Sequence, residues 1–318
     1  MRDIKNYSTS EWLRFIPFKH AFKQTRNDVW LAIYKNFRSK ALGVFLKETE
    51  RLRNRNVWLI VAFEQPWVLD WMLRMAQRTL TDTAVLVFDN SRRAVARLDI
   101  ERVCRNHGIP YLALPVNPTR HVNRSHGMAM TWIFHNVVRA IKPRLFAFID
   151  HDMIPIQKIE LSERLADQPF YGKLRTSPWA WQLWAGYCLF DFSTVADLRM
   201  NFLYDFSQKL DTGARNWGCL YQNHDRDRLR FADSRYVEVR DPATGKSMVV
   251  EIVDDRWLHI GNIGYNDNFR SKAQLCENLA QALEEAGPDS NANLLADRFC
   301  DGVSSVATLG VRPPTRFL

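Results

Sequence analysis

Two aspartates separated by one residue follow an apolar stretch near the middle of the chain. Residues 146–149 are apolar, and Asp150, His151 and Asp152 come directly after them. Two carboxylates this close repel each other at the end of a buried strand, and a divalent cation would relieve that repulsion. Mg²⁺ and Mn²⁺ favour such oxygen ligands and usually also bind substrate phosphates. The pair could instead cap a turn, but its position favours a site for Mn²⁺ or Mg²⁺.

Carboxylates also follow two earlier apolar stretches. Glu64 follows the stretch that ends at Phe63, and Asp89 follows residues 84–88. In open α/β sheets, ligands bind outside the carboxyl ends of the strands. We therefore expect Glu64, Asp89 and Asp150 to lie at one edge of a sheet.

Strands and helices alternate in the pattern from residue 56 onward. Strands are predicted at 57–63, 84–88, 111–115 and 145–149, and helices at 67–78, 93–106 and 126–141. This alternation predicts parallel βαβ units, and the unbroken apolar strands are typical of a sheet covered on both faces. The fold class is therefore α/β, with a Rossmann-like, mostly parallel sheet flanked by helices.

The alternation weakens after Pro155. Residues 179–192 are rich in aromatics, 236–240 and 247–253 predict a hairpin, and 271–285 predict a helix that ends before Gly287. The tail after Asp301 is expected to be a loop.

The excess positive charge is concentrated before residue 56. The chain has a net charge of +9, and residues 1–55 hold 13 Lys and Arg against 5 Asp and Glu. Charge this local indicates an anionic partner for this segment, and we expect no nucleic-acid partner. A helix is predicted from 28 to 45, capped by Asn27 or Asp28, with Trp30, Phe37 and Phe45 on one apolar face. That face either packs on the rest of the protein, or the basic helix lies on an anionic membrane.

The longest apolar run, 57–63, is far shorter than the roughly 20 residues that span a bilayer. Arg14, Lys19 and His20 interrupt any signal-peptide centre, and the five scattered cysteines form no CxxC pair. We therefore expect a cytoplasmic protein, with peripheral attachment at the inner membrane face as an open alternative.

Six short segments between residues 56 and about 265 resemble a GT-A glycosyltransferase close to the family 2 group. They are Asp89-Asn90-Ser91 at the second strand end, Gly127-Met-Ala129 in the third helix, Asp150-His-Asp152 as the DxD motif, Trp184-Ala-Gly186 at the sugar and acceptor site, Asp211-Thr-Gly at the catalytic carboxylate, and His259-Ile-Gly-Asn262 at the late histidine. Asn90 stands where the family has Asp, and no Glu neighbours Asp211.

The resemblance implies a metal-dependent transferase with a nucleotide-sugar donor and a glycan or glycoconjugate acceptor. It implies donor contacts by Phe63, Glu64, Asp89, Asn90, Gly127, Asp150 and Gly186, metal ligation by Asp150, Asp152 and His259, and Asp211 as an inverting base. Trp179, Trp181 and Trp184 would form an acceptor platform, because sugars stack on aromatic rings, or would pack in the core. Without the resemblance, a lone histidine at position 259 would more often be structural. The implied domains are an N-terminal extension (1–55) and a catalytic domain (56–318), divided into a nucleotide-binding half (56–155) and an acceptor half (156–318).

Two other functions are considered. A sugar nucleotidyltransferase shares the α/β sheet and metal carboxylates, but usually has a Gly-rich, basic loop after its first strand, which Phe63-Glu64-Gln65-Pro66 does not provide. A non-catalytic protein that binds an anionic surface would explain the basic N-terminus alone.

Overall fold

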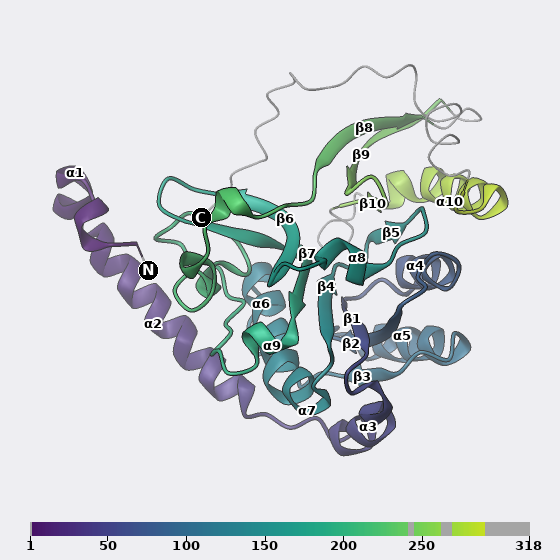
Figure 1. The fold of residues 1–318 in the computed structure, drawn as a ribbon, viewed down its shortest axis with the longest axis horizontal. Coiled ribbons are helices and arrows are strands. Elements are labelled where there is room, and N and C mark those ends of the chain that lie inside the picture. The colour runs from purple at the N-terminus through teal and green to yellow at the C-terminus, as the bar shows by residue number, and fades with distance from the viewer. Residues whose placement is uncertain (1, 241–244, 262–268, 290–318) are drawn as a thin grey trace.

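The computed structural model describes residues 2–240, 245–261 and 269–289, and its central sheet has the strand order β3-β2-β1-β4-β7-β6 (Figure 1). The strands are β1 (Asn56–Ala62), β2 (Thr83–Asp89), β3 (Tyr111–Ala113), β4 (Leu145–Ile149), β6 (Phe170–Thr176) and β7 (Trp181–Asp191). The first four are parallel, and β7 pairs antiparallel with both β4 and β6. The predicted mostly parallel α/β sheet is confirmed.

The β1 strand shows why its sequence is a continuous apolar run. Trp58, Ile60 and Ala62 face one core, which α4 (Pro66–Thr79), α5 (Ala94–Asn106) and α10 (Phe269–Ala286) cover. Val57, Leu59 and Val61 face a second core on the opposite side. That core is covered by α6 (Val122–Ile133), its π-helical continuation η3 (Phe134–Val138), α7 (Arg139–Ile141) and α3 (Leu42–Thr49). Alternate side chains of one strand thus enter different cores.

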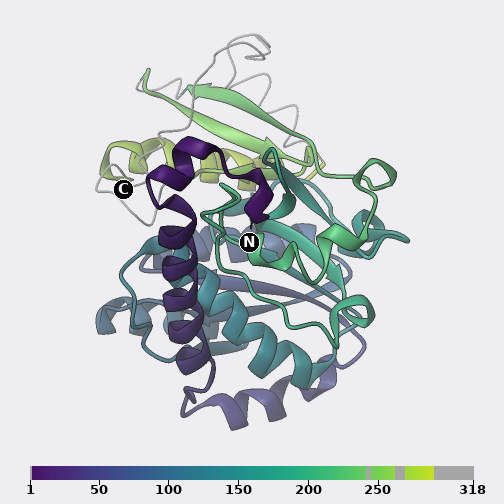
Figure 2. The same ribbon diagram turned by 90° about the vertical axis from the view of Figure 1, so that its left-hand side faces the viewer.

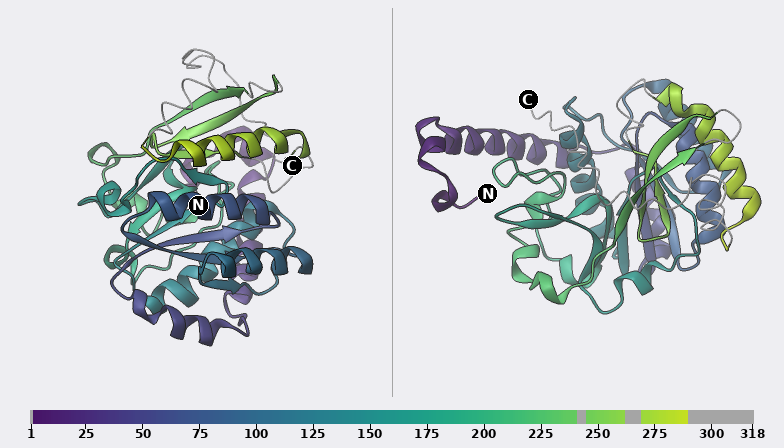
Figure 3. Two further views of the ribbon diagram at one scale, coloured as in Figure 1. Left: turned by 90° about the vertical axis from the view of Figure 1, so that its right-hand side faces the viewer. Right: turned by 90° about the horizontal axis from the view of Figure 1, so that it is seen from above.

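A second sheet starts immediately after the two aspartates. Its strand order is β5-β10-β9-β8, from β5 (Met153–Pro155), β10 (Trp257–His259), β9 (Ser247–Val253) and β8 (Ser234–Arg240). The predicted hairpin is confirmed as the antiparallel pair β8 and β9, and the predicted late helix is α10, which lies beside α4 (Figure 3). His259 pairs with Met153, so the second sheet brings a residue from much later in the chain to Asp152.

Smaller elements connect these layers. They are η1 (Ile4–Asn6), η2 (Glu50–Leu52), α8 (Leu161–Leu165), α9 (Phe192–Val195), η4 (Ala214–Asn216), η5 (Tyr221–Asn223) and η6 (Arg226–Arg228). The tail after Asp301 lies outside the described residues. Among the helices that are described, none has the length and apolarity to cross a membrane.

The predicted N-terminal helix was wrong in extent and in the residues that share its buried face. α1 (Thr9–Leu13) is followed by α2 (Ile16–Lys35), and a non-helical segment separates α2 from α3. Asn27 and Asp28 therefore lie inside α2 and do not cap it. Pro17 stands in the first turn of α2, where its missing N–H breaks no helical hydrogen bond. α2 buries Gln24, Asn27, Leu31 and Tyr34, whereas Trp30, Ile33 and Phe37 are exposed. Phe45 is buried as expected, but on α3.

Candidate functional site

Asp150 and Asp152 form a turn between β4 and β5 that two other strands hold in place. The Asp150 amide donates to the Gly186 carbonyl at 3.0 Å, and the Ile260 amide donates to the Asp152 carbonyl at 3.2 Å. Among the described residues, no hydrogen-bond donor reaches either carboxylate. The nearest basic side chains are His126, whose Nε2 lies 3.6 Å from Asp150 Oδ1, and His259, whose Nε2 lies 3.8 Å from Asp152 Oδ1.

Ionisation of both aspartates is unfavourable unless a positively charged group lies beside them. Burial raises the pKa of Asp150, and the neighbouring Asp152 carboxylate raises it further, while His126 and His259 oppose that shift. Asp152 itself is only 8% exposed. The Asp150 side chain keeps 23% of its surface exposed, so the turn concentrates negative charge at a position that is only partly open to water.

His259 is held by a buried carboxylate on the adjacent strand. Its Nδ1 lies 3.2 Å from Glu251 Oε2, so Nε2 faces Asp152, and Lys173 forms a buried ion pair with Glu251. Burial alone would lower the pKa of His259, but the carboxylates of Asp152, Glu251 and Asp150 raise it overall. Burial alone would raise the pKa of Glu251, but hydrogen bonds from His259 and Lys173 lower it to about 2. A carboxylate behind an imidazole is a common way to orient a metal-binding histidine.

The protein alone offers an incomplete set of metal ligands. In the described part of the chain, no group of three or more His, Cys, Asp or Glu side chains is arranged as a ready-made metal site. A cation here would need additional ligands from substrate or water. Mg²⁺ and Mn²⁺ commonly bind in this way, through one or two carboxylates plus phosphates.

Trp184 and Gly186 on β7 lie against the aspartates. The Trp184 ring is 4.9 Å from the His259 ring, and Lys173 Nζ is 5.2 Å from the Trp184 ring centre. A Cβ at position 186 would lie 2.3 Å from the Trp184 ring and 2.6 Å from Asp150 Oδ2. Glycine is therefore required for this arrangement, and half-buried Trp184 is the predicted aromatic that the structure brings to the site.

The other two tryptophans lie elsewhere. Trp181 is 6% exposed and packs against Phe170, Trp217 and Tyr221, so its place in an acceptor platform was wrong and the core alternative applies. Trp179 is half-buried, and the Arg2 guanidinium covers its ring at 3.8 Å.

Asp89 and Asn90 follow β2 but are not open to a ligand in this conformation. Asp89 is fully buried, with Oδ1 accepting from the Ser91 amide at 2.7 Å and Oδ2 accepting from the Tyr111 hydroxyl at 2.9 Å. Asn90 donates to Ser125 at 3.0 Å, and its buried Oδ1 has no hydrogen-bond partner among the described residues. Both side chains thus fix the strand end locally.

Glu64 and Phe63 follow β1. Glu64 adopts a left-handed φ of 60° and accepts hydrogen bonds from the Arg92 and Arg93 amides at 2.6 and 3.0 Å. Burial alone would raise the pKa of Glu64, but these bonds and the Arg93 guanidinium lower it. Phe63 is half-buried beside it. The Glu64 carboxylate therefore holds the turn after β2.

The first turns of α6 connect Asp150 to Asp211. Asn123 donates to Asp211 Oδ1 at 2.7 Å, and His126, three residues later, approaches Asp150. Side chains three residues apart on a helix lie about 5–6 Å from each other on one face, so both aspartates face the same part of α6. Sequence reasoning missed His126 and Lys173, because their partners lie far away along the chain, and it missed Glu251, because its contact with His259 depends on the register of β9 and β10.

Gly127 supports the same region through packing. A Cβ at this position would lie 2.5 Å from the Phe202 carbonyl oxygen, which accepts a hydrogen bond from the Gly213 amide at 2.7 Å. The missing side chain lets α6 approach the loop that carries Asp211. Gly127 therefore positions that loop, and the structure gives it no direct place in a ligand site.

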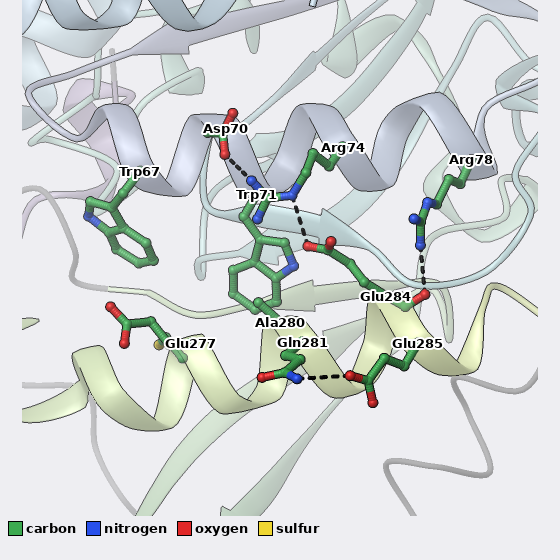
Figure 4. A pocket seen from close by; sticks show the side chains of 11 residues that line it. Trp67, Asp70, Trp71, Arg74, Arg78, Glu277, Ala280, Gln281, Glu284 and Glu285 are labelled. Carbon is green, nitrogen blue, oxygen red and sulfur yellow. Dashed lines mark hydrogen bonds and ion pairs between the residues drawn. The ribbon is translucent and has the colours of Figure 1, made fainter.

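A groove of about 620 Å³ between α4 and α10 lies outside this cluster (Figure 4). Its arginines are already paired: Arg74 bonds to Asp70 and Glu284, and Arg78 donates to the Glu284 carbonyl. The polar groups of the groove mainly join the two helices.

Comparisons with known proteins identify no family for this chain. No protein-family model and no curated protein sequence matches it. Among solved structures, the chain is similar to the mannosyltransferase PcManGT from Pyrobaculum calidifontis in complex with GDP-Man and Mn²⁺, at 12% identity and a TM-score of 0.35. The match covers 58% of this chain and 56% of that chain. A likeness this distant says nothing about function, which must be argued from the side chains.

Proposed function

We propose that this chain is a metal-dependent glycosyltransferase of the GT-A type. It would transfer a sugar from a nucleoside diphosphate donor to a hydroxyl group of a glycan or an envelope glycoconjugate. The observation that carries the proposal is the pair Asp150 and Asp152: two crowded carboxylates at the end of a parallel strand, without a hydrogen-bond donor in the described part of the chain, beside an oriented histidine.

The cation would be Mn²⁺ or Mg²⁺, held by Asp150, Asp152 and His259. The residues fit such an ion because two carboxylates and one imidazole leave positions for donor phosphates, and imidazole is compatible with Mn²⁺ but suits Mg²⁺ less well. When bound, the metal would stabilise the negative charge that develops on the leaving diphosphate. Glu251 would keep His259 in the orientation that ligation requires.

The donor would lie over Asp150, Gly186 and Trp184. Lys173 and Arg175 lie 5.2 and 5.9 Å from the Trp184 ring centre and bring positive charge to this side of the site. Asp89 would act on the nucleoside side of the site, either by exchanging its Tyr111 and Ser91 partners for the ligand or by holding the strand end on which the ligand rests.

Asp211 would accept the proton of the acceptor hydroxyl. Its Oδ1 is anchored by the Asn123 side chain and the Thr212 amide, both at 2.7 Å. Among the described residues no donor reaches Oδ2, so one oxygen is available to a substrate. A base on the acceptor side corresponds to direct displacement with inversion at the anomeric carbon.

The test is a panel of nucleotide sugars, with thermal stabilisation measured with Mn²⁺ and with excess EDTA, followed by analysis of the products. We expect one donor class to stabilise the protein only with metal, and to release nucleoside diphosphate. Release of pyrophosphate from a sugar phosphate and a nucleoside triphosphate would identify a nucleotidyltransferase instead. Full turnover in excess EDTA would refute the metal-dependent proposal.

A further inference from the structure

The outer face of α2 is apolar. Phe18, Phe22 and Val29 keep 61%, 70% and 54% of their surface exposed. They continue a series that starts before the helix and repeats at helical spacing. We define this outer stripe as Leu13, Phe15, Phe18, Phe22, Val29 and Ile33, all of which are exposed. Soluble helices normally turn such a face toward the core.

The inner face of α2 is anchored mainly through polar side chains over the middle of the helix. Gln24 donates to Asp205 at 2.6 Å, Asn27 donates to the Tyr204 hydroxyl at 3.2 Å, and Asp28 pairs with Arg215 at 2.8 Å. Leu31 and Tyr34 add apolar contacts only near its end. α2 therefore buries its more polar face and exposes apolar side chains, the reverse of the usual arrangement. The outer stripe requires another explanation.

The charges beside the outer stripe have one sign. Arg14, Lys19, Lys23 and Arg26 lie along it, and Lys23 Nζ is also 5.2 Å from the centre of the Phe206 ring. The single acidic residue between positions 12 and 40 is Asp28, which faces Arg215. Large apolar side chains next to cations are typical of helices that lie in the interface of an anionic membrane.

The shape of the molecule leaves this face accessible. Figure 2 shows α2 crossing one side of the molecule, and Figure 3 shows α1 and the start of α2 extending beyond the body of the sheets. A flat surface that lies parallel to the helix axis could therefore contact the outer stripe.

We propose that the outer stripe binds an anionic lipid bilayer, with α2 parallel to the surface. Phe15, Phe18 and Phe22 enter the boundary between headgroups and acyl chains, while Lys19 and Lys23 meet the lipid phosphates. A second copy of the chain is a poorer occupant, because a symmetric dimer through this face would bring the cations of both copies together. A bilayer that carries negative charge has no such conflict.

Membrane attachment would also bring the acceptor side of the proposed site close to the bilayer. The inner contacts of α2 reach residues 204–215, the segment that carries Asp211. If the proposed transferase function holds, on which this step rests, an acceptor embedded in the same membrane would be presented to Asp211. Lipid binding itself does not depend on that function.

The experiment is co-sedimentation of the full chain with vesicles of phosphatidylcholine, with and without phosphatidylglycerol, at low and high salt. We expect binding to the anionic vesicles, much weaker binding to the neutral ones, and release at high salt. Removal of each cation near the surface should weaken binding about fivefold. Lys19→Glu with Lys23→Glu should therefore weaken binding by more than tenfold, and Phe15→Ser, Phe18→Ser and Phe22→Ser combined should abolish it.

The controls use a helix with similar exposure on another face. Val95→Ser with Leu98→Ser on α5 removes two side chains that are 69% and 62% exposed, and should leave vesicle binding unchanged. Arg102→Glu with Arg105→Glu on α5 is the charge control. The thermal midpoint and Mn²⁺-dependent donor stabilisation, measured without lipid, show whether each variant is folded and keep this test separate from the transferase test.

Three results would overturn the proposal. They are equal sedimentation with neutral and anionic vesicles, no sedimentation with either, and wild-type binding by both stripe variants. A dimer that forms without lipid and is lost in the Phe15, Phe18 and Phe22 variant would assign the stripe to a second copy instead.

Discussion

Carboxylates lie at the carboxyl ends of β1 and β2 and also at the carboxyl end of β4. Their surroundings differ. Asp89 uses both oxygens to bind Ser91 and Tyr111, and Glu64 accepts the amides of Arg92 and Arg93. The carboxylates of Asp150 and Asp152 receive no hydrogen bond from the described residues and have histidines at 3.6 and 3.8 Å. The same type of sequence signal thus marks two kinds of strand end.

This difference separates a structural carboxylate from one that needs a partner. Hydrogen-bond donors stabilise an ionised carboxylate, so Glu64 and Asp89 require no ligand. Burial of a carboxylate that accepts no hydrogen bond destabilises its ionised form, and burial raises the pKa of Asp150. Position after a strand is therefore a weaker indication of function than a carboxylate at that position to which no described residue donates a hydrogen bond.

The strongest test of the comparison is Asp152→Ala. We expect donor turnover to fall to the level seen in excess EDTA, a loss on the order of 10³-fold, because the metal would no longer be held against the diphosphate. Circular dichroism should show an intact fold. Asp227→Ala, at a side chain that is 81% exposed, is the control and should retain full activity. Retained metal-dependent turnover in Asp152→Ala would exclude Asp152 as a metal ligand.

The second test concerns Asp211, on the other side of α6. Asp211→Asn should bind donor normally but transfer sugar about 10²–10⁴-fold more slowly, because an amide cannot accept the acceptor proton. Asn123→Ala should show a smaller loss, since it removes only the anchor of Oδ1. Donor affinity and transfer rate, measured separately, decide the question. Near-normal transfer by Asp211→Asn would move the base elsewhere or indicate a retaining mechanism.

The third test concerns His259. Its replacement by Ala should weaken metal-dependent donor binding by about 10–100-fold, the range typical of groups that support a metal site. The Mn²⁺ concentration that gives half-maximal stabilisation is the measurement. A variant that melts earlier but binds donor at the same Mn²⁺ concentration would assign His259 a structural function.

The sheet and the position of the two aspartates after β4 were predictable because their signals are local. Strands covered on both faces must be continuous apolar runs, and β1, β2 and β4 lie where those runs lie. β7 was not predicted as a strand of the same sheet, although its segment was recognised as aromatic. Its antiparallel pairing with β4 depends on a long connection whose path no local pattern specifies.

The rest of the site could not be predicted because it depends on distant contacts. His126 reaches Asp150 from α6, and Glu251 and Lys173 come together from β9 and β6 behind His259. The orientation of α2 could not be predicted for a related reason. Helical periodicity locates an apolar face, but it does not show whether that face meets the core or another partner.

A fourth test compares the stability of the two kinds of strand end directly. Asp89→Asn should lower the free energy of unfolding by about 1–3 kcal/mol, because the amide cannot accept at both oxygens and leaves a buried partner unpaired. Asp152→Asn should leave stability unchanged or higher in EDTA, since it removes repulsion with Asp150. Urea denaturation of both variants without metal is the measurement. Equal destabilisation would show that the two strand ends do not differ in the way proposed.

The smallest effect is expected at Asp82, a satisfied carboxylate at the opposite end of β2. Its oxygens accept from the Leu161 and Ser162 amides at 3.1 and 3.0 Å, so it caps the start of α8. Burial alone would raise the pKa of Asp82, but these bonds and those from the Ser162 and Thr83 hydroxyls lower it. A lowered pKa means that ionised Asp82 stabilises the fold above its unfolded pKa of about 3.9, and that this contribution is lost as the pH falls through the folded value.

Asp82→Ala should therefore cost about 1 kcal/mol at pH 7, the typical loss of a helix cap, and the difference from wild type should narrow as the pH falls below about 4. Urea denaturation at pH 7, 5 and 3.5 measures it, with Asp227→Ala as an exposed control whose stability should match wild type throughout. A difference that stays constant over this range would mean that the ionised form of Asp82 contributes nothing. The contrast between satisfied and unsatisfied carboxylates would then require another explanation than hydrogen bonding.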